Sequence, residues 1–226
     1  MLGKTLLISG GVTDLDFVAQ YLSEHSFDSI VCADFGLEAA YALHLPVKYI
    51  MGDFDSVSPE ILEYYRHPKE AHIKAEFMQY PTAKNATDTE MAIQWLVEQK
   101  PEEITILGAT GGRLDHLLAN INTLMCPLAA GIPAFIIDPY NRLFLTDHSV
   151  KLLRKNLFGK YISLLPLTER VYPVNLRGLK YGLEDYTLTI GNGRAVSNEI
   201  AEDADVAEIS FTAGILIIIE SRENIV

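Results

Sequence analysis

Short apolar runs alternate with amphipathic stretches along the first part of the chain. The runs that fit buried strands are Thr5–Ser9, Ile30–Ala33, Tyr49–Met51, Ile104–Leu107 and Ala134–Ile137. Strands that alternate with helical segments are typical of a parallel sheet flanked by helices. The pattern therefore predicts an N-terminal α/β domain of the Rossmann-like kind.

Two helices are well marked in this part. The first extends from Thr87 to about Gln99, because Thr87 and Glu90 form a capping box. Its apolar face is expected to consist of Met91, Ala92, Trp95 and Leu96. The second helix begins near Leu114 and carries apolar residues at helical spacing, namely Leu117, Leu118, Ile121, Leu124 and Met125.

After Asp138 the pattern changes to alternating strands separated by turn residues. The expected strands are Tyr161–Leu165, Tyr186–Ile190, Ala207–Phe211 and Gly214–Ile219. Such a series predicts a smaller C-terminal all-β domain, a sandwich or a barrel. The change falls between Pro139 and Leu153 without a Ser/Gly-rich linker, and we place the two domains at residues 1–140 and 141–226.

Composition narrows the range of functions. Apolar residues make up 49% and charged residues 21% of the chain, which is typical of a globular protein. The formal net charge of -12 opposes binding to a phosphodiester backbone, so no nucleic-acid partner is expected. The two cysteines, Cys32 and Cys126, fit no disulfide framework or zinc site. No segment has the features of a signal peptide or a membrane span, and we expect a cytoplasmic protein with no membrane partner.

A glycine or an aspartate follows each predicted parallel strand, Asp34 among them. In open α/β sheets, ligands bind beyond the carboxyl ends of the strands, so these residues define the first candidate site. Asp53 and Asp55, two residues apart after the third strand, can share a hard cation such as Mg²⁺. The alternative is a turn in which Asp and Ser satisfy backbone donors.

Lys84 and Asp88 flank the start of the first helix. Since a helix N-terminus suits an anion, Lys84 can meet a phosphate while Asp88 completes the cation site. The alternative for Asp88 is an acid stabilised by the helix dipole alone.

A glycine-rich loop, from Gly108 through Gly111 and Gly112, connects the fourth strand to the second helix. Its amides can approach a phosphate closely, although the motif is neither a Walker A sequence nor a dinucleotide fingerprint. Arg113 offers a planar fork for phosphate oxygens. Asp115 can orient Arg113, bind a metal or accept a hydroxyl proton, and a helix-face or core role is expected for His116.

Several motifs occur in an order that resembles the thiamine pyrophosphokinase family over nearly the whole chain. They are GDFDS, PTAKNATDTE, ILGATGGRLDHLLANI, YISLLPLTE, GLKYGL and AVSNE. The resemblance implies an enzyme that transfers pyrophosphate from ATP to the hydroxyl of thiamine with Mg²⁺, giving thiamine diphosphate and AMP. It also implies a homodimer with sites between subunits.

The resemblance further assigns roles to individual residues. Metal-binding acids fall on Asp53, Asp55 and Asp88, and nucleotide and phosphate contacts fall on Lys84, Arg113 and Asp115 with the nearby glycines. Asp34 is expected to contact the cofactor. In the β domain, the aromatic residue that stacks on thiamine falls on Tyr181, and a Ser-Asn pair falls on Ser197 and Asn198.

The residues themselves leave other readings open. Tyr181 can be a half-buried strand aromatic, and Ser197 and Asn198 can be turn residues. The segment Ala33–Gly36 resembles the family's ADGGA, but Phe35 replaces a glycine and would be strained if its φ were positive. A Mg²⁺-dependent phosphohydrolase, another nucleotide-using kinase, or a binding module without turnover are the rival functions.

Overall fold

The computed structural model describes residues 2–68, 74–80 and 86–223. The chain divides into two compact units, Met1–Pro139 and Tyr140–Val226. The sequence analysis had placed this boundary between residues 140 and 141. In the described part of the chain, every helix is too short or too polar to cross a membrane.

Unit 1 contains a parallel sheet with the strand order β4-β3-β2-β1-β5-β6. The strands are β1 (Lys4–Ile8), β2 (Ser29–Ala33), β3 (Tyr49–Gly52), β4 (Glu76–Gln79), β5 (Glu103–Leu107) and β6 (Ala134–Ile137). All five strands predicted for this unit are present, each within one residue of its expected bounds. β4 was missed, because its four residues are only partly buried and lack a continuous apolar run.

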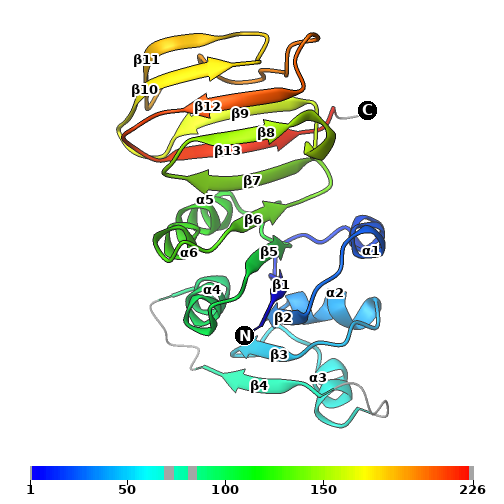
Figure 1. Cartoon of the computed structure of the whole chain (residues 1–226). Helices are drawn as coiled ribbons and strands as arrows, with labels where there is room; N and C mark the ends of the chain where they lie inside the picture. Colours follow the sequence, from blue (N-terminus) through cyan, green and yellow to red (C-terminus); the bar gives the residue numbers. More distant parts are fainter. Residues whose placement is uncertain (1, 69–73, 81–85, 224–226) are drawn as a thin grey trace. The chain divides into compact units, whose positions relative to one another are not determined.

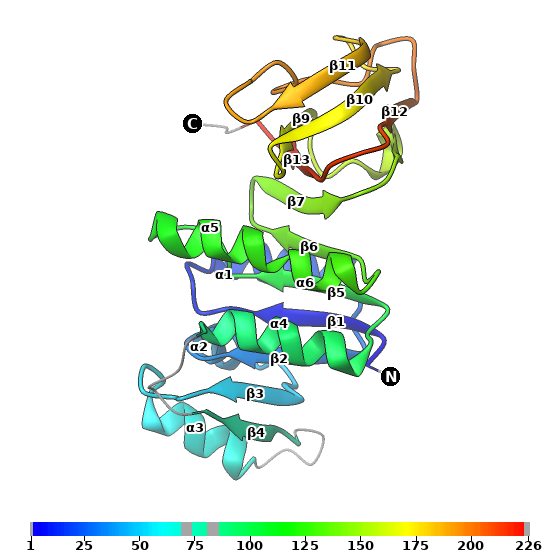
Figure 2. The same ribbon diagram turned by 90° about the vertical axis from the view of Figure 1, so that its left-hand side faces the viewer.

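Helices cover both faces of this sheet (Figures 1 and 2). One face carries α1 (Leu15–Glu24), α2 (Gly36–Ala42) and α3 (Pro59–Arg66), and the other carries α4 (Asp88–Gln99), α5 (Leu114–Thr123) and α6 (Met125–Ala129). Because the strands are parallel, the loops that follow β1, β2, β3 and β5 all leave from the same edge of the sheet.

Helix α4 begins as predicted. The Thr87 hydroxyl accepts a hydrogen bond from the backbone N–H of Glu90 at 3.1 Å, which caps the helix. Ala92 and Leu96 are buried, as expected, and Ile93 joins them. The buried hydroxyls of Ser9 and Thr89 lie 2.5 Å apart and connect the end of β1 to the first turn of α4.

Helix α5 forms where predicted, but its apolar face is not a buried face. Leu118 is 60% exposed, and Met125, at the start of α6, is 37% exposed, whereas Leu124, between the two helices, is buried. Leu118 therefore lies at helical spacing, as predicted, without being buried. Helical spacing identifies which residues share a face, but it does not show that the same chain supplies a surface to cover that face.

Unit 2 is built from antiparallel strands with two pairing orders, β7-β13-β9 and β11-β10-β12-β8. Their bounds are β7 (Asn141–Thr146), β8 (Val150–Leu153), β9 (Tyr161–Pro166), β10 (Arg170–Arg177), β11 (Leu183–Thr189), β12 (Val206–Ser210) and β13 (Leu216–Ser221), and η1 (Arg154–Asn156) is a short 3₁₀ turn. One buried cluster contains residues of both sets, including Ile162 and Ile218 from the first and Val174 and Ile209 from the second.

Candidate active site

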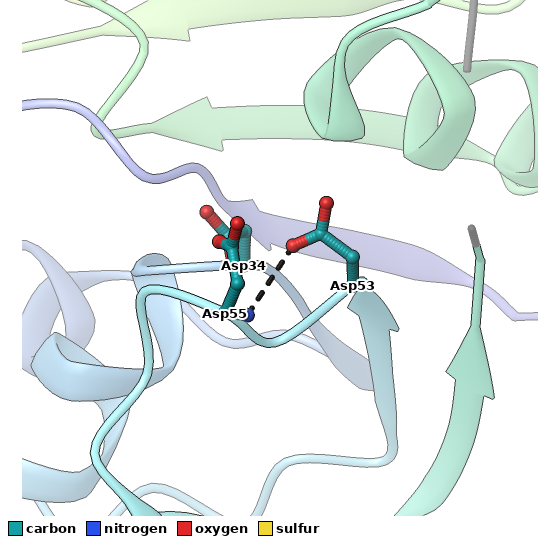
Figure 3. Close-up of side chains that lie close together, drawn as sticks. All are labelled: Asp34, Asp53 and Asp55. Atoms are coloured by element: carbon teal, nitrogen blue, oxygen red, sulfur yellow. Dashed lines mark hydrogen bonds between the residues drawn. The ribbon is translucent and has the colours of Figure 1, made fainter. Parts of the chain in front are cut away.

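Three aspartates meet at the carboxyl edge of the parallel sheet. Asp34 directly follows β2, and Asp53 and Asp55 lie in the loop after β3, which pairs with β2. One carboxylate oxygen of each lies within 4.8 Å of those of the other two. Figure 3 shows the three side chains directed toward one another from these two loops. We call Asp34, Asp53 and Asp55 the acidic cluster.

Hydrogen bonds hold the acidic cluster in place. The hydroxyl of Ser56 donates to Asp34 Oδ2 at 2.7 Å, and the N–H of Asp34 donates to the Met51 carbonyl at 2.8 Å. The N–H of Asp55 donates to Asp53 Oδ1 at 3.3 Å (Figure 3). Asp34 Oδ1 is buried and has no hydrogen-bond partner among the described residues. An unsatisfied buried carboxylate oxygen beside two more carboxylates matches the donor set that a hard divalent cation requires.

The charges of the cluster repel one another. The pKa of Asp55 is raised above its ordinary value, first by its side-chain hydrogen bond with Asp53, then by the charge of Asp53, with smaller contributions from burial, Asp34 and Asp88. Neighbouring like charges disfavour ionisation of a carboxyl group. A cation bound by these oxygens would relieve the repulsion, so the residues fit Mg²⁺.

Asp88, the first residue of α4, lies beside the acidic cluster. A Cβ placed on Gly52 would lie 3.2 Å from Asp88 Oδ1, so this carboxylate faces the start of the loop that carries Asp53 and Asp55. The sequence analysis grouped Asp88 with Asp53 and Asp55, whereas the three closest carboxylates are those of Asp34, Asp53 and Asp55. Lys84 lies outside the described residues.

The glycine-rich loop after β5 adopts a backbone that side chains would strain. Gly108, Gly111 and Gly112 have φ values of 67°, 81° and 67°. The N–H of Gly11 donates to the Gly108 carbonyl at 2.7 Å, which fixes this loop against the end of β1. The buried side chain of Asn120 donates to the Ala109 carbonyl at 2.9 Å. The sequence analysis missed Asn120. Its position, a polar residue between the regularly spaced apolar residues of the helix, could have identified it.

Arg113 and Asp115 form an exposed ion pair at the start of α5. Arg113 Nε donates to Asp115 Oδ1 at 3.1 Å and Nη2 donates to Oδ2 at 2.6 Å. The pKa of Asp115 falls to about 2, mainly because of the hydrogen bond from Arg113. The two parallel hydrogen bonds are the geometry by which Asp115 would orient Arg113, one of the three roles considered. The exposed His116 does not belong to the core.

The condition under which Phe35 would be strained is not met. Phe35 has a φ of -57° and caps α2, while the positive φ of 46° falls on the preceding Asp34. Aspartate tolerates the left-handed region better than bulky residues do. Phe35 therefore has no backbone strain, and its aromatic ring, next to the acidic cluster, is 48% exposed.

In unit 2, Asn198 holds Tyr181. The Tyr181 N–H donates to Asn198 Oδ1 at 3.0 Å, and Asn198 Nδ2 donates to the Tyr181 carbonyl at 2.7 Å. Tyr181 lies in the loop between β10 and β11 and is 61% exposed, so the alternative of a half-buried strand aromatic is wrong. Ser197 has a φ of 55°, and its N–H donates to the Ser163 hydroxyl at 3.0 Å.

Fold and site together are those of an α/β enzyme with an acidic centre at the carboxyl edge of its parallel sheet. Residues 18–136 match the model for the thiamin pyrophosphokinase catalytic domain, and residues 147–216 match that for the vitamin B1 binding domain of the same enzymes. The chain belongs to the thiamin pyrophosphokinase family.

Individual relatives agree with the family models. Thiamine pyrophosphokinase of Bacillus subtilis is 31% identical over 231 residues, which cover 97% of this chain and all of the relative. The crystal structure of thiamine pyrophosphokinase from Bacillus subtilis has a TM-score of 0.83 at 27% identity and covers 97% of this chain and 99% of its own. A thiamin pyrophosphokinase family protein from Enterococcus faecalis has a TM-score of 0.80 at 28% identity, with 98% and 100% coverage.

Proposed function

We propose that this thiamine pyrophosphokinase moves a pyrophosphoryl group from ATP to thiamine with the acidic cluster as its catalytic centre. The hydroxyl oxygen of thiamine attacks the β-phosphorus, and the bond from that phosphorus to the oxygen on the α-phosphorus breaks. Thiamine diphosphate and AMP result, and the hydroxyl proton passes to solvent. The observation that carries the proposal is the convergence of Asp34, Asp53 and Asp55 in a chain that matches both domains of the family.

In unit 1, the acidic side chains would bind the metal and the cationic side chains would bind the phosphates. Asp53 and Asp55, with Asp34 and Asp88 beside them, would hold Mg²⁺, which supplies positive charge to the phosphate oxygens. Arg113, oriented by Asp115, binds phosphate oxygens through its fork, and Lys84 adds a second positive charge. The amides of Gly111 and Gly112 approach the same phosphates. Positioning and electrostatics account for the catalysis, without a covalent intermediate on the protein.

Unit 2 supplies the acceptor. Tyr181 offers an exposed ring on which the pyrimidine of thiamine stacks, and Ser197 and Asn198 lie in the connection between β11 and β12, where Asn198 bonds the Tyr181 backbone. The positive φ of Ser197 and the two hydrogen bonds of Asn198 support a shaped loop at this point.

The finer features of fold and assembly belong to the same proposal. Unit 1 is of the Rossmann-like kind, which its strand order and two helix layers support, and unit 2 is a β-sandwich, which its shared core supports. The protein acts in the cytoplasm as a homodimer with sites at the subunit interface. The exposed apolar side chains of α5 support a partner surface.

A product assay separates this function from its rivals. Purified protein is incubated with thiamine, ATP and Mg²⁺, and thiamine diphosphate, AMP, ADP and free phosphate are quantified by chromatography. Equal amounts of thiamine diphosphate and AMP are expected. ADP in place of AMP indicates another kinase, and free phosphate without thiamine diphosphate indicates a phosphohydrolase. Binding of both substrates without any product indicates a binding module.

A variant pair tests the acidic cluster itself. Asp53→Asn removes a carboxylate from the cluster, and we expect kcat to fall by about a hundredfold or more, since the charge of the triphosphate is then poorly neutralised. Asp203→Asn is the control, because Asp203 is an exposed acid of unit 2. Equal activity of the two variants would remove the acidic cluster from the mechanism.

A further inference from the structure

The edge of β9 that does not face β13 pairs with the segment that leads to Asn198 in unit 2. Ile162 and Asn198 donate a backbone hydrogen bond to each other, at 2.8 and 2.9 Å. The next bond along β9 joins the Leu164 N–H to the Ala195 carbonyl at 2.8 Å, whereas a regular antiparallel ladder would place Val196 at this point. The segment therefore holds one residue more than the stretch of β9 with which it pairs, which is a β-bulge.

The burial of the residues in this segment shows the same interruption. Ala195 and Asn198 are each 2% exposed. Buried and exposed residues alternate along a regular strand, but Val196 and Ser197, which are both exposed, lie next to each other between these two. The bulge thus turns an apolar side chain and a hydroxyl group outward side by side. Asn198 also forms the two hydrogen bonds with the backbone of Tyr181, so the bulge is joined directly to the loop that presents the Tyr181 ring.

Ser163 is the residue of β9 that lies opposite the bulge. Its hydroxyl oxygen accepts a hydrogen bond from the Ser197 N–H at 3.0 Å. Ser197 has a φ of 55°, a conformation that residues other than glycine keep only where surrounding contacts hold them there. The backbone bonds of Ile162 and Leu164 hold the two ends of the bulge, and the side chain of Ser163 holds its middle.

We infer that Ser163 is a positioning residue for the thiamine site, and that it acts by fixing the bulge that presents Val196 and Ser197 next to the loop of Tyr181. The inference rests on the proposed function, in which thiamine stacks on Tyr181. An aromatic ring, an apolar side chain and a hydroxyl group together match an acceptor that has apolar ring faces and a polar edge. Ser163 acts without touching thiamine, because its effect passes through the backbone of Ser197.

The Ser163 hydroxyl sets how much of the protein carries the shaped bulge. Without an acceptor for its N–H, Ser197 can leave the left-handed region, and thiamine then binds only the fraction of molecules that keep the bulge. The apparent affinity for thiamine falls in proportion to that fraction. Loss of one hydrogen bond changes such an equilibrium by about two- to tenfold. The phosphate-binding residues belong to unit 1, so the affinity for ATP should stay the same.

The test removes the hydroxyl group and then restores it. In the full chain, Ser163→Ala should raise the Kd of thiamine, measured by calorimetry, and its KM by about fivefold, with the KM for ATP unchanged. Ser163→Thr keeps a hydroxyl group and should return both values to those of the wild type. Exchange of the Ser197 amide proton, followed by NMR, should be faster in Ser163→Ala than in the other two proteins. Ser210→Ala, which changes a half-buried serine of β12, is the control.

Three results would overturn the inference. An unchanged affinity for thiamine in Ser163→Ala would show that the bulge does not shape the thiamine site. Equal changes for thiamine and ATP would indicate a general loss of stability, and a Ser163→Thr variant that behaves like Ser163→Ala would exclude the hydroxyl group as the cause. Calorimetry and amide exchange need no turnover. Thiamine binding without formation of thiamine diphosphate would therefore count against the proposed reaction and leave the role of Ser163 standing.

Discussion

The side-chain amide of Asn198 forms two hydrogen bonds with the backbone of Tyr181, one accepted at 3.0 Å and one donated at 2.7 Å. The loop that presents the exposed Tyr181 ring is thus fixed through a residue that is itself 2% exposed. Asn198 is therefore a positioning residue for Tyr181.

Replacement of Asn198 by alanine should loosen this loop. Asn198→Ala removes both of these part-buried hydrogen bonds, and at about 0.5–1.5 kcal/mol for each we expect the free energy of unfolding to fall by about 1–3 kcal/mol. We also expect a higher KM for thiamine with little change in the KM for ATP. Chemical denaturation and steady-state kinetics measure the two effects, with exposed Asn156→Ala as the control. A rise in both KM values would argue against a specific role at Tyr181.

The acidic cluster should cost stability when no cation is bound. Because Asp53, Asp34 and Asp88 all raise the pKa of Asp55, its ionised form is disfavoured in the folded chain at neutral pH. Asp55→Asn removes one charge, so the metal-free variant should melt at a higher temperature than the metal-free wild type. Addition of Mg²⁺ should raise the Tm of the wild type more than that of the variant. Thermal melts with EDTA or with Mg²⁺ check both expectations, and a Tm of the variant that matches the wild type in EDTA would contradict the first.

The pKa of Asp115 predicts the pH dependence of its role. Its folded pKa of about 2 lies below its ordinary value of 3.8, so its contribution to stability is fully present above pH 3.8 and is lost as the pH falls through about 2. Asp115 therefore stays ionised throughout the neutral range. In Asp115→Asn we expect a higher KM for ATP, because Arg113 is no longer oriented, and an unchanged shape of the pH–rate profile.

The pH–rate profile of Asp115→Asn shows whether Asp115 orients Arg113 or accepts a proton. Loss of an acid limb of the pH–rate profile in Asp115→Asn would identify Asp115 as the base instead. Glu169→Gln is the matched control, because Glu169 also forms an exposed ion pair, at 2.8 Å, with the adjacent Arg170.

Much of unit 1 could be predicted because its strands are buried on both faces. Such strands read as continuous apolar runs, as in Ser29–Ala33, which is buried throughout. β10 in unit 2 was missed because Pro173 interrupts its alternation, so that the buried Val171 and Val174 are three residues apart. Alternation of apolar and polar residues identifies a strand only when the alternation continues along its whole length, and in β10 it does not.

The candidate site likewise has a part that the sequence predicts and a part that only the fold reveals. Asp53 and Asp55 were identified because they are neighbours in the sequence and follow a strand. The hydrogen bond between Ser56 and Asp34 joins two loops, and it follows only from the pairing of β2 with β3. The positive φ of Asp34, which spares Phe35 from strain, is likewise set by the three-dimensional path of the chain.

The glycine-rich loop should depend on Asn120. Its side chain donates to the Ala109 carbonyl from within the structure, and Asn120→Ala removes this bond while the carbonyl stays buried. We expect a loss of about 1–3 kcal/mol in the free energy of unfolding and a higher KM for ATP, because the loop that precedes Arg113 is less well fixed. Asn122→Ala, an exposed position of the same helix, should show neither effect. An unchanged KM for ATP in Asn120→Ala would separate this hydrogen bond from substrate binding.

Gly36 allows α2 to start directly against β1. A Cβ at this position would lie 2.2 Å from the Ile8 carbonyl oxygen, and the obstacle is backbone, which cannot turn away as a side chain can. Gly36→Ala should therefore lower the free energy of unfolding by about 1–3 kcal/mol or more, and the shift of α2 should displace Phe35 and Asp34 just before it. Gly193→Ala is the matched control, because a Cβ there meets no atom within 4 Å. Denaturation curves for the two variants measure the difference. If they coincided, α2 and β1 would have to separate easily, and the acidic cluster would lose the rigid support that its geometry requires.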